Sequence, residues 1–150
     1  MEIEKEIRQQ SPFSSEYEKM VVNILFTSGW LDGINNGRLK PFGITTQQYN
    51  ILRILRGQHP KPATVNMLIE RMLDKSSNAS RLVEKLRIKG YVSRSSSESD
   101  KRAVNVHITD KGLQMLNKIG ESQKEFEKQF QTLTKTEAAQ LSAMLDKLRG

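Results

Sequence analysis

Two short apolar repeats in the middle of the chain constrain the fold more than any other feature. They consist of Val65, Leu68, Ile69 and Met72, and of Ala79, Leu82, Val83 and Leu86. Apolar residues spaced three and four apart line one face of an α-helix, so each repeat predicts a short amphipathic helix. Polar residues at 74–76 interrupt the pattern, and Gly90 is a suitable C-terminal stop for the second helix. Two such helices joined by a tight turn predict a helix-turn-helix.

Two short strands are predicted directly after this helix pair. Residues 91–94 form the first, and in 103–108 the apolar Val104, Val106 and Ile108 alternate with other residues, as in a half-buried strand. Residues 95–102 are then the loop of a β-hairpin, which forms a small wing beside the helix-turn-helix.

Longer helices are expected on the N-terminal side of this region. Residues 17–31 carry apolar side chains around more than one face of a helix, so this helix needs more than one packing partner. Pro41 and Gly43, two residues that commonly end helices, are expected to end this helix. Thr45, followed three residues later by Gln48, predicts a capping box that starts the next helix.

Helices are also expected on the C-terminal side. Thr109 should cap one long helix that reaches Phe130, and Thr134 with Glu137 predicts a second capping box. The final helix has an apolar face made of Leu141, Met144, Leu145 and Leu148. No proline-rich or glycine-rich linker divides the chain, so residues 1–150 should form a single domain. The predicted fold is mainly α, a winged helix-turn-helix with a small β-hairpin wing and long terminal helices.

Positive charge is concentrated in the same central region. The chain has 24 Lys and Arg against 17 Asp and Glu, which gives a formal net charge of +7. Residues 75–111 contain nine basic and four acidic residues, which is most of this excess. A local excess of this kind is typical of a surface that binds a polyanion such as DNA. An ordinary solvated positive face is the alternative when charge is considered alone.

The second helix of the pair is the candidate for reading DNA, because short hydrogen-bonding residues and long cations lie opposite its apolar face. In the major groove, Arg or Lys can bond guanine, Asn can bond adenine, and Ser can reach bases or phosphates. We expect Arg81 and Asn78 to read bases, and Lys75 and Lys101 to bind mainly phosphates. The alternatives are an ordinary solvated face and, for the Ser and Asn residues, N-capping. The expected contacts of this helix and its approach are Lys75, Ser76, Ser77, Asn78, Ser80, Arg81 and Lys85.

The tip of the predicted hairpin combines small residues with adjacent cations. A cationic tip can reach a minor groove, whose narrow A·T-rich stretches attract Arg. We expect Arg102 to enter the minor groove and Asp100 to orient it through an ion pair, next to Lys101. Arg94, on the first strand, is also expected to contact DNA. A mobile surface turn is the alternative for the tip.

Several segments carry motifs that can be compared with known proteins. The wing tip Asp-Lys-Arg at 100–102 precedes an apolar strand and an Ile-Thr-x-x-Gly helix start at 108–112. Residues 80–92 read as a recognition helix with its exit, and 43–52 as the start of the preceding helix. Together these segments resemble the MarR (multiple antibiotic resistance regulator) family of bacterial transcription regulators. Ile108 stands where the family usually has Leu, which is a mild departure.

This resemblance implies a homodimer that binds double-stranded DNA. Residues 14–40 and 110–150 would be the dimerisation helices, and residues 44–109 the winged helix-turn-helix. The apolar face of the final helix agrees, because this helix begins after the winged region is complete. The dimer would straddle a pseudo-palindromic operator with half-sites about one DNA turn, roughly 34 Å, apart. The family usually represses transcription.

The resemblance also implies a site for a small molecule. Many family members release DNA when a small, often aromatic or phenolic, ligand binds between the dimerisation helices and the winged domain. We expect Trp30, Ile34, Tyr49 and Arg53 to border such a pocket here. The alternative for Trp30 is a place in the core or the dimer interface, as is usual for a Trp on a broad apolar helix.

Other classes of function find no support in the sequence. The absence of cysteine excludes disulfides and thiol redox sensing and, with no apolar run near the N-terminus, predicts a cytoplasmic protein. Neither His59 nor His107 has a partner at ligand spacing, so no metal or cofactor is expected. Without a nucleophile motif or a phosphate loop, we do not expect an enzyme. The alternative to a DNA reader is a winged-helix protein-interaction module without specific DNA binding.

Overall fold

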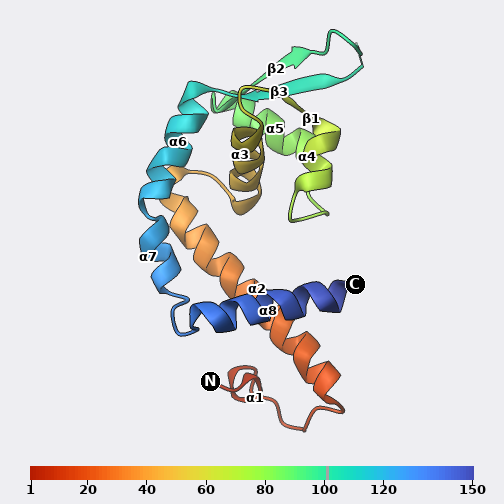
Figure 1. The fold of residues 1–150 in the computed structure, drawn as a ribbon, viewed down its shortest axis with the longest axis vertical. Helices are drawn as coiled ribbons and strands as arrows, with labels where there is room; N and C mark the ends of the chain where they lie inside the picture. The colour runs from red at the N-terminus through yellow and green to blue at the C-terminus, as the bar shows by residue number, and fades with distance from the viewer. Residues whose placement is uncertain (101) are drawn as a thin grey trace.

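The computed structural model, which describes residues 1–100 and 102–150, is mainly helical with a small antiparallel sheet. In chain order the elements are α1 (Ile3–Glu6), α2 (Glu16–Leu39), the 3-10 helix η1 (Lys40–Phe42), α3 (Thr46–Gln58), β1 (Ala63–Thr64), α4 (Val65–Arg71), α5 (Ala79–Ile88), β2 (Val92–Ser96), β3 (Val104–Ile108), α6 (Asp110–Glu121), α7 (Gln123–Lys128) and α8 (Lys135–Arg149). The sheet and α3–α5 lie at one end of the molecule, and α2 runs from there to the other end, where α8 crosses it (Figure 1).

The central helix pair forms where the apolar repeats predict it. The Thr64 hydroxyl accepts the backbone N–H of Met67 and so caps α4, and the Asn78 side chain caps α5. Gly90 adopts a positive φ of 80° directly after α5, a conformation that glycine tolerates without strain. The helix-turn-helix and the stop after it are therefore confirmed.

The wing hairpin also forms, but a further strand joins it. Strand β3 lies between β1 and β2, and both neighbours are antiparallel to it. Ala63 of β1 pairs with Val106, and Val92 of β2 pairs with Ile108. The prediction missed β1 because two residues are too short to show a strand periodicity. The hairpin extends away from the helices (Figure 1).

The hydrophobic core lies inside the winged region, where α3, α4 and α5 pack against the sheet. Both flanking helices contribute to it, since Leu39 from the end of α2 and Leu116 and Ile119 from α6 are almost fully buried. Gly112 lets α6 approach the wing closely, because a Cβ there would collide with the Tyr91 carbonyl oxygen. The terminal helices are thus anchored in the winged region at two points.

The C-terminal helices differ from the prediction. The single long helix expected from Thr109 to Phe130 is wrong: α6 ends at Glu121, and α7 begins after a turn at Ser122 with φ −87° and ψ 1°. The Ser122 hydroxyl donates to the Ile119 carbonyl at 2.8 Å and so competes for one of the last carbonyls of α6. The capping box of Thr134 and Glu137 before α8 is confirmed, as is that of Thr45 and Gln48 before α3.

The first residues of the chain fold back onto α2. Helix α1 buries Ile3, and Lys19 of α2 forms an ion pair with Glu4 at 2.6 Å. This bridge lowers the pKa of the Glu4 carboxyl, mainly through the hydrogen bond from Lys19. The N-terminal segment is therefore packed against α2.

Candidate nucleic-acid interface

Helix α5 presents a polar and basic face to solvent. Its opposite face is buried through Ala79, Val83 and Leu86, which fixes the rotation of the helix in the winged region. Arg81 and Lys85 lie one turn apart and are both exposed. Within the described part of the chain, neither side chain forms a hydrogen bond or an ion pair, so both are available to a ligand.

Two polar residues at the start of α5 interact with the protein itself or are buried, which differs in part from their expected contacts with DNA. The Asn78 Oδ1 accepts the backbone N–H of Arg81 at 3.1 Å, as a helix cap. Bidentate reading of adenine needs both the oxygen and the nitrogen of the amide, so Asn78 cannot read adenine in this way while it caps α5. The Ser77 hydroxyl oxygen is buried and does not face solvent. Ser80 remains exposed on the first turn.

The turn between α4 and α5 is held by Asp74. Its carboxylate accepts the Ser76 hydroxyl at 2.6 Å and the Ser76 backbone N–H at 2.9 Å. These hydrogen bonds lower the pKa of Asp74 from its ordinary value of 3.8, and the bond from the Ser76 hydroxyl has the largest effect. The Lys75 ammonium donates to the Glu70 carbonyl at the end of α4. Ser76 and Lys75 therefore shape the turn, and their expected DNA contacts would compete with these bonds.

Glu84 links the recognition helix to the wing. Its carboxylate oxygens form ion pairs with the guanidinium nitrogens of Arg87 in the same helix, at 2.7 Å, and of Arg94 in β2, at 2.8 Å. The hydrogen bond from Arg87, with the charges of Arg87 and Arg94, lowers the pKa of Glu84. Arg94 was expected to contact DNA, but here its guanidinium is engaged by Glu84. The spacing of Glu84 and Arg87 signals their pairing in the sequence, whereas nothing local signals Arg94.

At the wing tip, the contact between Asp100 and Arg102 differs from the expected ion pair. Asp100 accepts the backbone N–H of Arg102 at 2.9 Å. Among the described residues, the two side chains form no ion pair. Asp100 therefore orients the backbone of the tip, in the manner of an Asx-turn, and the Arg102 side chain is exposed. Lys101, also expected to contact DNA, lies outside the described residues.

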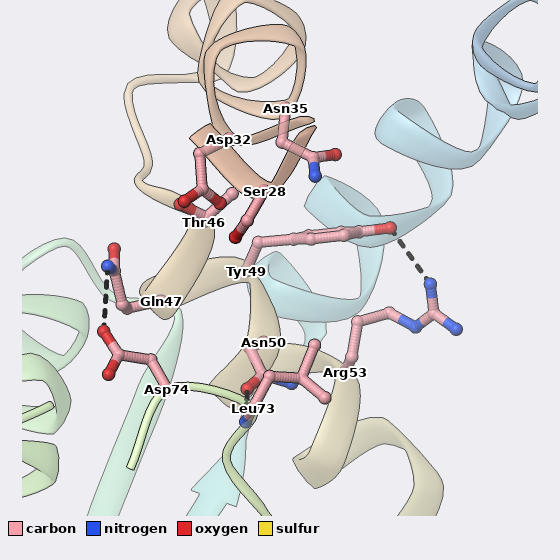
Figure 2. A pocket seen from close by; sticks show the side chains of 10 residues that line it. All are labelled: Ser28, Asp32, Asn35, Thr46, Gln47, Tyr49, Asn50, Arg53, Leu73 and Asp74. Carbon is pink, nitrogen blue, oxygen red and sulfur yellow. Dashed lines mark hydrogen bonds between the residues drawn. The ribbon is translucent and has the colours of Figure 1, made fainter. Parts of the chain in front are cut away.

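A cavity of about 600 Å³ lies between α2, α3 and the turn before α5. Its lining consists of Ser28, Asp32, Asn35, Thr46, Gln47, Tyr49, Asn50, Arg53, Leu73 and Asp74. Figure 2 shows the Tyr49 ring extending across it, with the hydroxyl toward Arg53, which donates to that oxygen at 3.1 Å. Two hydrogen bonds connect α3 to the turn: Asn50 accepts the Leu73 N–H at 2.9 Å, and Gln47 donates to Asp74 at 3.5 Å.

The cavity brings together two of the four residues expected around a ligand. Tyr49 and Arg53 line it, but Trp30 and Ile34 do not. On α2, Ser28 and Asp32 face the cavity, and Trp30 lies half a helical turn away from both. Its ring packs instead edge-on against Phe130, with the centroids 6.1 Å apart. Trp30 therefore does not line this cavity, and its contact with Phe130 fits the alternative of a packing role.

Residues 1–100 and 102–150 contain neither a candidate metal site nor a candidate membrane span. No three His, Cys, Asp or Glu side chains there are grouped so that they could hold a metal ion. No helix there is both long and apolar enough to cross a membrane.

Known proteins share both the sequence pattern and the fold. The MarR family model matches residues 42–103, from the end of η1 through the wing tip. YpoP of Bacillus subtilis strain 168, an HTH-type transcriptional regulator, is 31% identical over 106 residues, which cover 70% of this chain and 74% of YpoP. These relatives are transcription regulators and not enzymes.

Solved structures agree with this assignment. A mutant MarR from E. coli in complex with operator DNA has a TM-score of 0.80 at 24% identity, over 92% of this chain and 99% of that one. The organohalide-sensing regulator RdhR-CbdbA1625, solved in its 2,4-dichlorophenol-bound form, has a TM-score of 0.80 at 21% identity, over 94% and 86%. Both likenesses establish the winged fold. Together with the sequence match, they show that the chain belongs to the MarR family of DNA-binding transcriptional regulators.

Proposed function

We propose that the chain acts in the cytoplasm as a homodimeric repressor that binds a pseudo-palindromic operator and is released by a small ligand. The observation that carries the DNA-binding mode is the free basic face of α5. Arg81 and Lys85 are exposed on a helix whose rotation is fixed by its buried side. In this mode α5 enters the major groove, and Arg102 at the wing tip reaches the adjacent minor groove.

The proposed DNA contacts differ in their role. Arg81 reads a base, whereas Lys85, Lys75 and Lys101 add mainly phosphate affinity. Ser76 and Ser80 supply shorter polar contacts near the helix start, and Asn78 contributes its free amide N–H groups. Arg94 contacts a phosphate at the edge of the site while Glu84 holds it in place. The relative from E. coli supports this mode, since it was solved on operator DNA.

The homodimer rests on apolar side chains that the single chain leaves uncovered. On α2, Leu25 is 67% exposed, and on α8, Met144 is 61% exposed. A groove of about 700 Å³ between the two helices is lined mainly by apolar side chains, among them Ile24, Leu31 and Leu145. Monomeric proteins rarely expose contiguous apolar surface of this kind. A two-fold partner that offers the same surface would cover it.

The ligand site is the cavity beside Tyr49 and Arg53. An aromatic ring can stack on Tyr49 while the Arg53 guanidinium donates hydrogen bonds to a phenolate or carboxylate oxygen. The cavity also borders Asp74, which shapes the turn before α5. A ligand that displaces the Gln47–Asp74 or Asn50–Leu73 hydrogen bond would therefore move the start of the recognition helix. RdhR-CbdbA1625, with its bound dichlorophenol, supports a phenolic class of ligand.

The DNA-binding part is tested by selecting bound duplexes from a random pool at near-physiological salt and sequencing them. We expect a two-fold related motif whose half-sites are about one helical turn apart. A pool without enrichment would contradict sequence-specific binding and favour the protein-interaction alternative. Wild-type protein and the Arg81→Ala variant should be compared in the same pool, because an interaction module has no reason to respond to this change.

The ligand part is tested by titrating simple phenols and aromatic carboxylates into the protein–operator complex and following fluorescence anisotropy of the DNA. We expect release of wild-type protein, and release only at much higher ligand concentration for Arg53→Ala. Operator affinity without ligand serves as the control, since Arg53 lies on α3 and not on α5. Equal release of both proteins would remove Arg53 from the site.

A further inference from the structure

Arg38, near the end of α2, makes an unusual set of contacts for a single side chain. Its Nη2 donates to the Ile119 carbonyl at 3.0 Å and to the Gln123 Oε1 at 2.9 Å, and its Nε donates to the Ser122 hydroxyl at 3.1 Å. Its guanidinium also lies 4.5 Å from the ring centroid of Phe126. One half-buried side chain on α2 thus binds the end of α6, the turn after it and α7.

These contacts lie where both chain connections of the winged region meet. The chain enters this region from α2 through η1, and it leaves through α6 into α7 (Figure 1). Leu39, the next residue after Arg38, and Ile119, whose carbonyl Arg38 binds, belong to the core of the winged region. Any rotation of the winged region relative to the terminal helices must therefore change the dihedral angles at these two connections.

The Arg38 guanidinium adds polar contacts to the turn at Ser122. The Ile119 carbonyl at the end of α6 accepts Arg38 and the Ser122 hydroxyl, and a cation is favourable at a helix C-terminus. A planar guanidinium can donate in several directions at once, which an ammonium on a lysine cannot reproduce. Arg38 therefore fixes the angle between α6 and α7 and at the same time ties both to α2.

On the other side of the turn, α7 is held against α2 by aromatic packing. The rings of Phe126 and Phe130 are 5.1 Å apart, and Phe130 packs on Trp30. Helices α2 and α7 thus form one unit, while α6 belongs to the winged region. Arg38 is a polar link between the two units, in addition to the hydrogen bond that the Thr46 hydroxyl of α3 donates to Asn36 of α2 at 3.2 Å.

We propose that Arg38 is a positioning residue for DNA binding: it fixes the angle between the winged region and the terminal helices, and so the separation of the two recognition helices. This proposal rests on the homodimer proposed above. In such a dimer, a change of angle in each protomer displaces α5 at the far end of the winged region. Arg38 itself does not touch DNA.

The test measures the separation directly. The chain has no cysteine, so a single Ile88→Cys substitution at the exposed end of α5 gives one spin-label site per protomer. Pulsed electron resonance on the dimer then reports the label-to-label distance distribution, without DNA. We expect a narrow distribution with native Arg38, and a clearly broader or shifted one when Arg38→Gln is added. A glutamine side chain keeps much of the length of arginine but lacks its positive charge and the several N–H donors of the guanidinium.

A second readout uses DNA with altered half-site spacing. For native Arg38, insertion of one base pair between half-sites should weaken binding strongly. For Arg38→Gln, binding to the preferred spacing should fall about tenfold, the size expected for loss of a charge-assisted hydrogen-bond set, and the penalty for the insertion should shrink by a similar factor. Ile51→Val, a core change in α3, serves as the control for lost stability and should leave the spacing preference intact.

The outcomes separate the two proposals. If native protein shows a sharp distance and a sharp spacing preference and Arg38→Gln keeps both, the role of Arg38 is overturned while the dimer stands. If Ile51→Val, at a similar melting temperature, broadens both as much as Arg38→Gln, the effect is general loosening and the positioning role is overturned. If native protein gives no distance between labels, the homodimer fails and this inference fails with it.

Discussion

Arg81 is the residue on which sequence preference should depend most. It is exposed on the polar face of α5, and its own side chain is not needed to cap or brace the helix. Arg81→Ala should weaken operator binding by about 1–3 kcal/mol and relax preference at one base position, as for loss of a good base contact. Lys118→Ala, on the exposed side of α6, removes the same charge and should leave that preference unchanged. Competition binding with single-base operator variants measures both.

The salt dependence distinguishes this role from simple attraction. Removal of a phosphate contact such as Lys85 should reduce the slope of log Kd against log salt concentration by about one unit and weaken all sequences alike. An Arg81→Ala variant that behaved in the same way would show that Arg81 binds backbone and not a base.

Asp74 should make folding stability depend on pH in the acid range. Its pKa in the folded protein is lowered, mainly by the Ser76 hydroxyl, so the ionised form stabilises the fold above the ordinary value of 3.8. This contribution is lost as the pH falls through the lowered pKa. Asp74→Asn should therefore melt at a lower temperature than wild type near neutral pH, and the difference should shrink as the pH falls below 3.8. A difference that stayed constant over the acid range would contradict this role.

Among single residues, the sequence predicted which cations are exposed, but it did not predict which polar side chains are engaged in hydrogen bonds within the protein. A helical wheel is sufficient to place Arg81 and Lys85 opposite the buried side of α5. It cannot show that the Asn78 oxygen is used as a cap or that Arg94 is held by Glu84. Hydrogen bonds between side chains and nearby backbone decide such cases, and one residue type serves both uses.

Two glycines of α6 provide a matched test of how that helix is placed. A Cβ at Gly112 would collide with the Tyr91 carbonyl oxygen and lie 2.7 Å from Ile108 Cγ1, whereas at Gly120 it would meet nothing within 4 Å. Gly112→Ala should cost about 1–3 kcal/mol of unfolding free energy, as overpacking typically does. Gly120→Ala should instead be neutral or add up to about 1 kcal/mol. Urea denaturation of both variants measures this, and equal effects would contradict the close approach.

Whether an element could be predicted depended on where its determinants lie. Thr45 with Gln48 and Thr134 with Glu137 carry the start of a helix within four residues, so α3 and α8 were predicted correctly. The break between α6 and α7 could not be read in this way, because Arg38 lies 84 residues from Ser122. Strand β1 exists through its pairing with β3, which local sequence does not encode.

The single chain leaves apolar side chains of α2 and α8 uncovered, and the proposed homodimer can be tested with two equivalent changes. Leu25→Glu places a charge on the uncovered face of α2 and should convert the dimer to monomer in sedimentation velocity. Leu73→Glu, in the turn before α5, changes a residue that is even more exposed, at 87%. It should leave the dimer intact, because Leu73 lies at the winged end of the molecule. Dissociation by both changes would point to a different interface.

The lining of the cavity that we propose as the ligand site was only partly predictable at this scale. Tyr49 and Arg53 are one turn apart on α3 and were expected to act together, and they do lie together at the cavity. Trp30 was expected beside them from the resemblance to the family. Its direction depends on how α2 packs against α7, which the pattern of α2 alone leaves open since that helix is apolar on several sides.

The uncovered groove between α2 and α8 also determines which chains can assemble with each other. In the proposed dimer, mate choice depends on groove side chains such as Ile24 and Met144, whereas operator choice depends on α5 and the wing. Two regulators of the same fold in one cell therefore avoid mixed pairs only through differences in this groove. Exchanging the groove residues between two such proteins would create new pairings that keep their original operators, and hybrid dimers would recognise composite sites made of two unlike halves.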